Sequence, residues 1–572
     1  MATEEPRRTA DVDPSIEAYR FHEREWDGYE ALYEAFDWEV PERFNTATYC
    51  CDRWAETDPD RVALHTVGPD GEEARAHSYE DLQTLSNRLA NALADRGIER
   101  GDRVAVSGAQ KPEFVAAHLA TWKLGAVTVP LSLLFGPEGL GYRLRDSGTT
   151  AFVADRAALP ALREVRDDGD APDLETVFTV DADARRDETG FHYAVAGESR
   201  EFETRETWAD DPAALLYTSG TTGPPKGTLH GHRFLLGALV VYLTVGWNLD
   251  PSVERPTYSP VEWSWVATMY VGLLSSLYYG GSMVADPDPE FDPERTLDIV
   301  EGFDVGSVAG PTTVYRMLMG VEDVDRWDLS SLSVAVQGGE ALDQDVVEWL
   351  TSVAGDVAVH EGYGQTEVGV FVGDCEALGI GHQPGRMGRA LPGSEIAIID
   401  SEQPERVVDG EVGEIALRYE DNPMAFLEYW NEPEQTAAVR DDGWHRTGDL
   451  GIRHPDGSFE FHSRKDDVIV TSGYRVGPDE IEGTLTSHEA VAVAGVVGVP
   501  HAERGEVPKA FVVPSEGHTP DEVLREELQG HVKERLARYE YPRELEFVEE
   551  LPRTTTGKVR RQGLRDREGL TD

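Results

Sequence analysis

The loop YTSGTTGPPKGTLHG, at residues 217–231, carries the side chains best suited to chemistry. Its glycines allow successive backbone N–H groups to converge on an oxyanion. Lys226 adds a mobile positive charge to the same loop. The hydroxyl donors and glycines between Tyr217 and Lys226 are Thr218, Ser219, Gly220, Thr221, Thr222 and Gly223. Together these groups predict a polyphosphate site.

Two other interpretations of this loop are less consistent with its residues. A P-loop NTPase has different spacing, because Lys226 follows Gly223 by three residues and is itself followed by glycine. A flexible linker would not need Pro224 and Pro225, nor the apolar run at 213–216 that predicts a buried strand just before the loop. We therefore favour phosphate binding.

The elements around the loop alternate between strands and helices. This alternation predicts parallel, doubly wound sheets, in which ligands bind at the carboxyl ends of the strands. Helical spacing is found at residues 79–97 and 111–125, and strand-like runs at 102–108, 126–131, 150–155 and 174–180. The same pattern returns at 307–319, 332–342 and 356–367, where each strand ends in a turn that contains glycine.

The pattern changes near residue 388. Short strands with Pro and Gly turns, at 395–400, 413–419 and 458–463, predict a small β-barrel or sheet. The last hundred or so residues predict a compact α+β unit. The fold class is therefore α/β, with a large N-terminal region of mostly parallel sheets and a barrel-like part. We expect an N-terminal domain at 1–465 and a small mobile α+β domain at 466–572.

The charge is extreme, at −56 for 572 residues. Only seven of the 52 basic residues are lysine. Such a surplus of carboxylates argues against binding to nucleic acid or to an anionic membrane, because phosphate-rich surfaces would be repelled. It favours adaptation to high salt, where screening reduces the self-repulsion, over an ordinary acidic protein.

Cysteines and apolar stretches give little sign of another class. Cys50, Cys51 and Cys375 are too few for a disulfide framework or a cysteine-rich zinc site. The first residues lack the apolar core of a signal peptide, so we expect a cytoplasmic protein without membrane insertion. Residues 263–285 carry no charge and could span a bilayer, but Gly280 and Gly281 favour a buried helix leading into a strand.

Five ordered motifs resemble those of the adenylate-forming superfamily of acyl-CoA synthetases, adenylation domains and luciferases. They are the loop at 217–231, GYGQTEVG at 362–369, GWHRTGDLG at 443–451, the SRKDD segment at 463–482 and PRTTTGKVRRQGLR at 552–565. The stretches SPVEWSW at 259–265 and GPTTVYRMLM at 310–319 look most like medium-chain acyl-CoA synthetases. The resemblance covers nearly the whole chain.

The resemblance implies a two-step reaction. A carboxylic acid and ATP form an acyl-adenylate and diphosphate, and coenzyme A then displaces AMP. Lys226, Thr366, Glu367 and Lys558 are the implied catalytic residues, with Glu367 holding Mg²⁺. The further ATP-binding residues implied are Gly339, Glu340, Ala341, Gly362, Tyr363, Gly364, Gln365, Asp449, Arg464 and Arg475.

Alternative roles exist for several of these residues. Thr366 and Glu367 could cap a helix, and Asp449 could simply form a turn. Asp449 nevertheless suits a ribose, because its two oxygens can accept from a vicinal diol. Lys226 and Lys558 stand inside motifs in a chain that otherwise uses arginine, which we interpret as a need for a compact ammonium near crowded oxygens.

The second step implies a moving C-terminal domain and an open acyl pocket. The family rotates this domain at a position that matches Asp466. Candidate residues for coenzyme A are Ser472, Gly473, Tyr474, Arg504, Lys533 and Arg543. Some acetate-specific relatives have a tryptophan where Gly364 stands, so Gly364 predicts room for longer acids, partly refilled by Trp263 and Trp265.

The predicted activity is an AMP-forming acid–thiol ligase acting on short- to medium-chain, branched or aryl acids. The alternatives are an acetate-specific synthetase, an adenylation enzyme that loads a carrier protein, and a non-catalytic adenylate-binding protein. No carrier-like LGG[HD]S segment is present, and Glu367 and Lys558 argue against loss of catalysis. The partners are small molecules, and the sequence does not determine the oligomeric state.

Overall fold

The fold was obtained as a computed structural model. It describes residues 16–69, 71–218, 225–288, 290–340, 342–400, 405–471, 474–501, 504–515, 517–536, 541–553 and 558–570. The described chain divides into two compact units. The first lies within Met1–Thr218, Lys226–Glu395 and Arg418–Ala438, and the second within Ser219–Pro225, Ile396–Leu417 and Val439–Asp572. The boundary expected at residue 465 stays a prediction.

The first unit contains an eight-stranded sheet. Its order is β19-β9-β8-β4-β3-β5-β6-β7. Pairing is parallel from β8 to β7 and antiparallel for β8 with β9 and β9 with β19. The strands are β3 (Arg103–Ser107), β4 (Val127–Pro130), β5 (Ala151–Asp155), β6 (Thr176–Val180), β7 (Thr189–Gly190), β8 (Pro212–Thr218), β9 (Lys226–Gly231) and β19 (Glu428–Tyr429).

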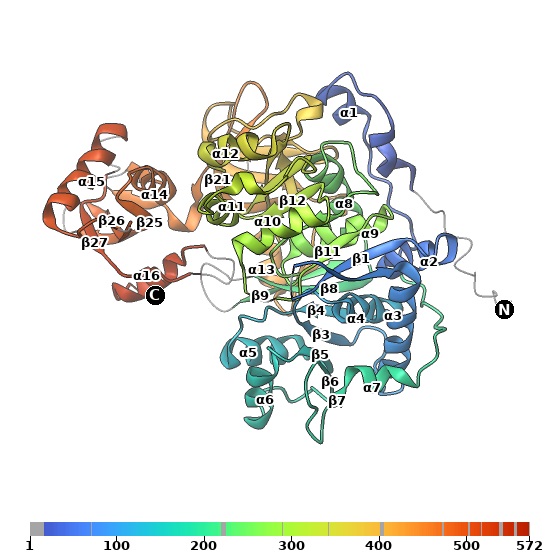
Figure 1. Cartoon of the computed structure of the whole chain (residues 1–572). Helices are drawn as coiled ribbons and strands as arrows, with labels where there is room; N and C mark the ends of the chain where they lie inside the picture. The colour runs from blue at the N-terminus through green and yellow to red at the C-terminus, as the bar shows by residue number, and fades with distance from the viewer. Residues whose placement is uncertain are drawn as a thin grey trace. The chain divides into compact units, whose positions relative to one another are not determined.

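Alternating residues of this sheet enter two separate cores. In β3, Val104 and Val106 pack with α3 (Tyr79–Ala94), α4 (Pro112–Lys123) and α7 (Phe191–Ala196), whereas Ala105 packs with α5 (Pro137–Ser147) and α6 (Leu159–Asp167). This alternation has the period of two that a strand imposes. Helices therefore cover both faces, and α3 lies beside α4 (Figure 1).

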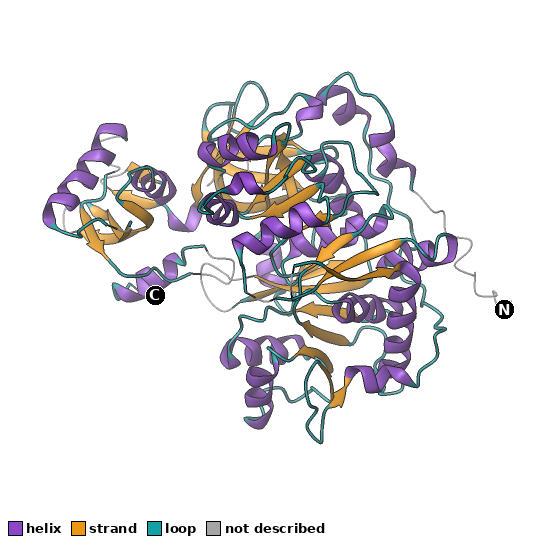
Figure 2. Cartoon of the chain, viewed as in Figure 1, coloured by secondary structure: helices purple, strands orange, loops and turns teal. Residues whose placement is uncertain are grey.

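A nine-stranded sheet forms the rest of the first unit. Its order is β16-β15-β14-β13-β12-β10-β11-β1-β2, parallel from β14 to β1. The strands are β1 (Val62–Val67), β2 (Glu73–Ser78), β10 (Thr257–Tyr258), β11 (Met283–Ala285), β12 (Ser307–Gly310), β13 (Val334–Gly338), β14 (Ala358–Gln365), β15 (Gly369–Gly373) and β16 (Arg389–Ala390). The mostly parallel, doubly wound sheets expected from the sequence are confirmed (Figure 2).

Three helices, α10 (Pro293–Gly302), α11 (Thr312–Met319) and α12 (Gln344–Ala354), share one core with β12 and β13. The remaining helical segments are η2 (Glu17–Glu23), α1 (Tyr29–Ala35), η3 (Thr48–Asp52), α2 (Arg53–Thr57), α8 (Phe234–Val241), η4 (Tyr242–Gly246), η5 (Ala267–Leu274), α9 (Ser275–Tyr278), η6 (Val324–Arg326), η7 (Glu376–Leu378) and α13 (Pro433–Ala438). The uncharged stretch 263–285 thus forms η5 and α9 and then enters β11, as expected.

The second unit contains the short strands expected after residue 388, and they form an open sheet rather than the barrel-like part. Its strands are β17 (Ile396–Ile399), β18 (Val412–Arg418), β20 (Arg440–Asp441), β21 (Trp444–Arg453) and β22 (Phe459–Arg464). The order β17-β18-β21-β20, with β22 paired to β21, does not close on itself within the described residues. With two residues, β20 offers too few hydrogen bonds to complete a ring.

The second unit also contains an α+β part. The sheet β24-β23-β26-β25, with β27 on β26, is composed of β23 (Ile469–Thr471), β24 (Tyr474–Val476), β25 (Val491–His501), β26 (Gly505–Pro514) and β27 (Glu544–Phe547). Its helical segments are η8 (Lys465–Asp467), α14 (Pro478–Thr486), α15 (Glu522–Arg535) and α16 (Arg561–Arg567). Asp521 caps α15 by accepting from the Leu524 N–H at 3.0 Å.

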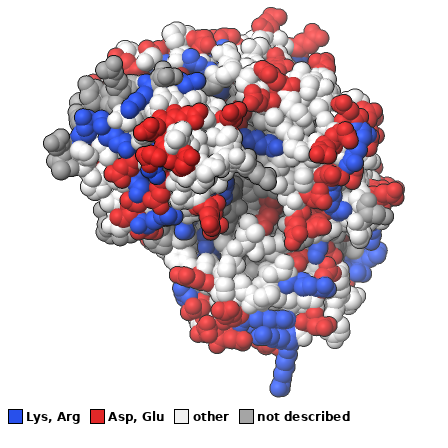
Figure 3. Space-filling model, turned by 60° about the vertical axis from the view of Figure 1, so that its left-hand side comes forward, with Lys and Arg blue, Asp and Glu red and all other residues white. Residues whose placement is uncertain are grey.

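No helix in the described part of the chain combines the length and the apolar character needed to cross a membrane. Acidic side chains are spread over the visible face with basic ones between them, rather than gathered in one patch (Figure 3). The net charge of −56 is therefore a repulsion distributed over the surface.

We predict that the melting temperature rises between about 0.1 and 2 M KCl, because the Debye length falls from about 10 Å to below 3 Å. Calorimetry in KCl and in K₂SO₄ of equal ionic strength measures this effect. Screening predicts a rise in both salts. A rise seen with sulfate alone, or none, would contradict it.

Candidate active site

The phosphate-loop motif lies at the end of a hairpin. Antiparallel pairing of β8 with β9 places Thr218 opposite Lys226, and the Thr218 hydroxyl donates to the Lys226 carbonyl at 3.4 Å. Gly227 permits close packing at this position, since a Cβ there would lie 2.9 Å from Leu215 Cδ1. The loop residues Ser219, Gly220, Thr221, Thr222 and Gly223 lie outside the described residues.

Tyr429 links two of the predicted catalytic residues. The Lys226 Nζ lies 5.3 Å from the centroid of the Tyr429 ring, and the Tyr429 hydroxyl donates to Glu367 Oε1 at 2.9 Å. Pairing of β19 with β9 sets Tyr429 beside Thr228, and the Phe426 N–H holds the Glu367 carbonyl at 2.8 Å. The structure thus gathers a cation, a phenol and a carboxylate. Tyr429 carries no motif signal, because only long-range pairing brings it here.

His230 and Thr366 meet behind this cluster. The His230 ring is buried, and burial lowers its pKa to about 3. The imidazole is therefore neutral at physiological pH. Because this ring carries no charge, it adds no second cation to Lys226 for binding an anionic ligand.

The predicted adenine-pocket residues come from the carboxyl ends of two neighbouring parallel strands. Gly338 of β13 pairs with Gly362 of β14, so the segments that follow them emerge at the same edge. In the first segment, Glu340 accepts from the N–H of Thr313 at 3.1 Å and from its hydroxyl, at the start of α11. This carboxylate thus supports a helix N-terminus, a structural use of its charge. Ala341 lies outside the described residues.

The second segment carries Tyr363, Gly364 and Gln365 at the end of β14. The Tyr363 ring is half-buried and meets the edge of Phe371, with ring centroids 5.3 Å apart. Its expected contact with adenine stays a prediction.

Gly364 has a different role from the one expected. A Cβ at this position would lie 2.0 Å from the Gly369 carbonyl oxygen and 2.5 Å from the Val370 Cα. The side-chain direction therefore points at the backbone of β15, not into an open acyl pocket. The irregular register between Tyr363 and Gly364 brings the two strands this close. Glycine is required here by backbone packing.

The two tryptophans assigned to the acyl pocket differ in environment. Trp263 is buried, and its indole N–H has no hydrogen-bond partner among the described residues. Trp265 is half-buried in the turn before η5, where its backbone N–H donates to the Glu262 carbonyl at 3.1 Å.

Asp449 and Arg464 are brought together in the second unit. They pair across β21 and β22, with Arg464 Nη1 2.8 Å from Asp449 Oδ1. Glu414 holds the part of β21 just before Asp449 by accepting from the Gly448 N–H at 3.1 Å and from Arg446 Nη2 at 2.8 Å. Glu414 was not found by sequence reasoning, because a carboxylate in a short strand has no distinguishing pattern.

The residues expected to serve the second step are only partly placed. Lys558 is exposed. Lys533 Nζ lies 4.1 Å from the Tyr541 ring centroid, and Arg543 donates to the Tyr541 hydroxyl at 3.2 Å, so two candidates for coenzyme A share one tyrosine. Arg504 is half-exposed. The backbones of Asp466, Tyr474 and Arg475 lie in η8 and β24, and Ser472 and Gly473 are outside the described residues.

Retained lysines prove to be a weaker marker than the sequence suggested. Lys123 is fully buried and lies 2.6 Å from Asp52 Oδ1, and Lys111 lies 2.7 Å from Asp155 Oδ2. Lys465 and Lys509 also form ion pairs. A lysine that escapes replacement by arginine can therefore be structural.

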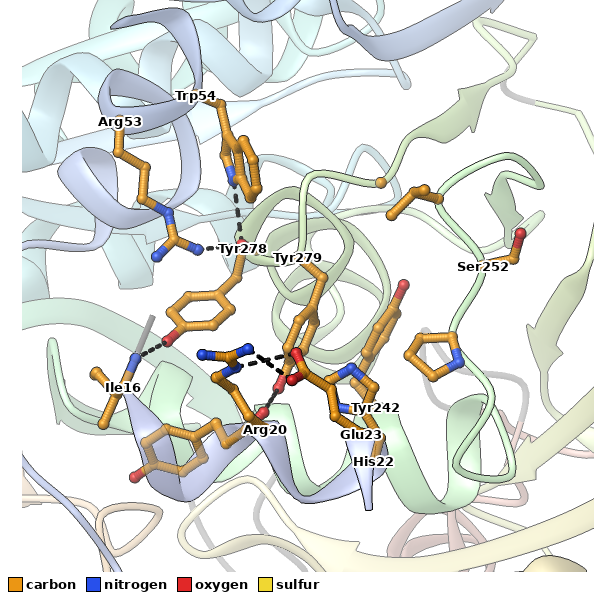
Figure 4. A pocket seen from close by; sticks show the side chains of 14 residues that line it. Ile16, Arg20, His22, Glu23, Arg53, Trp54, Tyr242, Ser252, Tyr278 and Tyr279 are labelled. Carbon is orange, nitrogen blue, oxygen red and sulfur yellow. Dashed lines mark hydrogen bonds and ion pairs between the residues drawn. The ribbon is translucent and has the colours of Figure 1, made fainter. Parts of the chain in front are cut away.

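A cavity of about 320 Å³ lies elsewhere in the first unit (Figure 4). Its aromatic wall includes the rings of Tyr242 and Tyr279, which stack 5.5 Å apart, and Arg20 and Arg53 lie at its rim and wall. Part of its lining comes from the segments just before β10 and β11, at the opposite strand ends from the motifs. None of the predicted site residues lines it.

Glu361 is a buried carboxyl group beside the adenine-pocket segments. It accepts from the Leu342 N–H at 3.4 Å, and its own N–H donates to Asp374 Oδ2 at 3.0 Å. Burial, together with the Asp374 and Asp343 charges, raises the pKa of Glu361 to about 8, although the hydrogen bond from the Leu342 N–H acts in the opposite direction. Glu361 is therefore protonated at neutral pH, and it joins β14 to the segments that follow β13 and β15. A charged residue at the end of an apolar strand was the signal that could have found it.

The comparisons with known proteins agree over most of the chain. The AMP-binding enzyme family matches residues 51–430, and the AMP-binding enzyme C-terminal domain matches 480–558. The chain is 35% identical over 540 residues to acyl-coenzyme A synthetase ACSM4, mitochondrial, of Homo sapiens, covering 92% of this chain and 91% of that one.

Two further relatives have similar coverage. An uncharacterized acyl--CoA ligase of Bacillus subtilis (strain 168), YtcI, is 35% identical over 499 residues, with 86% and 90% covered. The crystal structure of the anthranilate CoA ligase AuaEII in complex with anthranoyl-AMP has a TM-score of 0.83 at 28% identity, covering 93% of this chain and 98% of that one.

We predict that Glu361→Gln removes a pH dependence of stability. Because its pKa is raised, Glu361 keeps its proton in the folded protein. In the unfolded chain the same carboxyl group loses this proton as the pH rises above its ordinary pKa of 4.5. The contribution of Glu361 to the free energy of unfolding is therefore present at low pH and is lost as the pH rises toward about 8. The slope is at most about 1.4 kcal/mol per pH unit.

Urea unfolding of wild type and Glu361→Gln between pH 5 and 9 measures the difference. The exposed Glu348, also a glutamate of the first unit, provides the control Glu348→Gln, which should leave the pH profile unchanged. A pH-independent difference between wild type and Glu361→Gln would show that Glu361 is ionised in the folded state.

Proposed function

The chain belongs to the AMP-binding enzyme family, and we propose that it is an AMP-forming acyl-CoA synthetase. It would join a carboxylic acid to coenzyme A and convert ATP to AMP and diphosphate. The observation that carries the proposal is the Lys226–Tyr429–Glu367 cluster at the phosphate-loop hairpin. A cation and a carboxylate on either side of one tyrosine suit a phosphate with its metal ion, since the cation can bind the phosphate and the carboxylate can bind the metal.

The first step joins an oxygen of the carboxylic acid to the α-phosphorus of ATP and expels diphosphate. Lys226 and the loop N–H groups would balance the phosphate charge, and Lys558 would bind the oxygens at the reacting centre. In the second step the thiol sulfur of coenzyme A bonds to the acyl carbon, its proton is released, and AMP leaves.

Glu367 fits the Mg²⁺ that we propose here. Within the described residues, no group of three or more His, Cys, Asp and Glu is arranged to hold a metal. Mg²⁺ often binds through one or two carboxylates together with substrate phosphates, so a single half-buried carboxylate held by Tyr429 is a suitable donor. When bound, the ion would neutralise phosphate charge.

We assign the other groups by their motifs. Gly339, Glu340, Ala341 and Tyr363 would surround adenine, and Asp449 would accept from the ribose hydroxyls with Arg464 and Arg475 near the nucleotide. Rotation at Asp466 would exchange Lys558 for the segment 472–474, with Arg504, Lys533 and Arg543 near the phosphates of coenzyme A. These roles remain proposals.

The acyl substrate is proposed to be a short- to medium-chain, branched or aryl acid. The names of the relatives support this range, since they include an anthranilate CoA ligase. Trp263 remains a proposed wall of the pocket. Gly364 does not itself support this range of acids, because the backbone of β15 fills the space where its side chain would be.

Work at high salt and a cytoplasmic location also remain proposals. The charge of −56 supports the first. The relative in Homo sapiens, acyl-coenzyme A synthetase ACSM4, is named as mitochondrial.

We predict that the purified protein forms acyl-CoA and AMP in equal amounts from ATP, coenzyme A and an acid. Mass spectrometry over a panel from acetate to octanoate, with isobutyrate and benzoate, measures the product. Adenylate formation without thioester would favour loading of a carrier protein, and neither product would overturn the proposal. A sharp preference for acetate would contradict the proposed acid range.

We predict that Lys558→Ala lowers adenylation about 100-fold or more, in line with the loss of one charge-stabilising group. Thiolysis of supplied acyl-adenylate should remain nearly unchanged. Arg567→Ala, an exposed cation on the same terminal segment, is the control and should affect neither step. Equal loss in both steps would contradict the use of Lys558 in one step alone.

A further inference from the structure

A group of ion pairs brackets the predicted pivot at Asp466. On its N-terminal side, Arg464 pairs with Asp449 at 2.8 Å and Lys465 pairs with Glu414 at 3.2 Å. These partners belong to the β17–β22 sheet. The residues just before the pivot are therefore held to that sheet.

The residue after the pivot is held differently. Asp467 is buried, with a side chain 5% exposed, and it accepts from Arg561 Nη1 at 2.8 Å and from Arg565 Nη2 at 2.9 Å. Both arginines lie on α16. Each oxygen of the carboxylate thus has its own arginine, and charge-assisted bonds of this kind are among the strongest side-chain hydrogen bonds.

Arg561 is also fixed from a second direction. It donates to Asp479 at 2.6 Å and to Glu482 at 2.7 and 3.0 Å, both in α14. One guanidinium therefore joins the residue after the pivot, α14 and the first turn of α16. Its rigid fork suits it to hold several carboxylates at fixed angles.

The same helix supports Lys558. Arg561 follows Lys558 by three residues, and Val559 between them forms a backbone bridge with Arg553. The Arg560 N–H also donates to the Pro552 carbonyl at 2.7 Å. Leu564 is buried in the apolar cluster of β25 and β26. Backbone bonds thus hold Val559 and Arg560, the two residues that join Lys558 to α16.

We propose that Asp467 is a positioning residue for Lys558. Its carboxylate joins α16 to the residue that follows the pivot, so rotation at Asp466 carries Asp467, α16 and Lys558 as one body. Lys558 then reaches one defined place in the adenylation orientation. This inference rests on the proposed function, in which Lys558 serves adenylation.

The test is Asp467→Asn in the full-length protein, measured in the two half-reactions. Adenylation should fall about 10- to 100-fold, because a displacement of about 1 Å can cost that much. Thiolysis of supplied acyl-adenylate should change less than about 2-fold, since it does not use Lys558. Circular dichroism and the melting temperature report whether the variant folds.

A matched control is Glu568, a carboxylate at the C-terminal end of α16. Glu568 binds Lys509 at 2.6 Å and so ties the end of α16 to β26 without contacting the pivot. Glu568→Gln should leave both half-reactions within about 2-fold of wild type. If Asp467→Asn does not fold, Arg565→Gln removes only one of the two bonds and should cause a smaller loss of adenylation alone.

A double-mutant cycle separates positioning from general stability. In a Lys558→Ala background, Asp467→Asn should cause no further loss of adenylation. A further loss, an equal loss in both half-reactions or no loss in the single variant would overturn the inference. If Lys558→Ala itself spares adenylation, the role of Lys558 fails and the inference fails with it. If only Asp467→Asn departs from expectation, the proposed function stands.

Discussion

The parallel register of β12, β13 and β14 is the constraint on which the first unit's site depends. Because Gly310, Gln337 and Glu361 lie side by side in this register, the segments beyond them emerge at one edge of the sheet. Residues 19 or more positions apart in sequence thus become neighbours. The Thr313–Glu340 and Leu342–Glu361 contacts both cross between these segments.

Backbone proximity then limits which residues can occupy this edge. The contact of Gly364 with Gly369 and Val370 leaves no volume for a side chain, and Gly369 itself has a φ of +64°. Glycines in the motif therefore serve strand packing as well as ligand approach. A substitution at Gly364 would move β15 before it reshaped an acyl pocket.

Charge is used in two distinct ways. Most carboxylates lie at the surface, where they add repulsion and solubility. A few are buried and paired, such as Asp52 with Lys123, Asp449 with Arg464 and Asp467 with two arginines. Removing one partner of a buried pair is costly because it leaves an uncompensated charge. These pairs therefore hold the positions of neighbouring segments.

The amino-acid sequence by itself determined the fold class and the ordered motifs, because apolar periodicity and glycine spacing are local properties. It predicted the helix at 79–97 and the strand after residue 102, which the structure confirms with slightly different ends. Only the tertiary structure decided that Tyr429 joins Lys226 to Glu367, that Gly364 faces a backbone and that the short strands form an open sheet. Each depends on pairing between distant segments, and the sequence pattern of a strand does not specify its partner. For the same reason, the sequence did not predict the ion pairs of Asp467, whose two arginines lie more than ninety residues away.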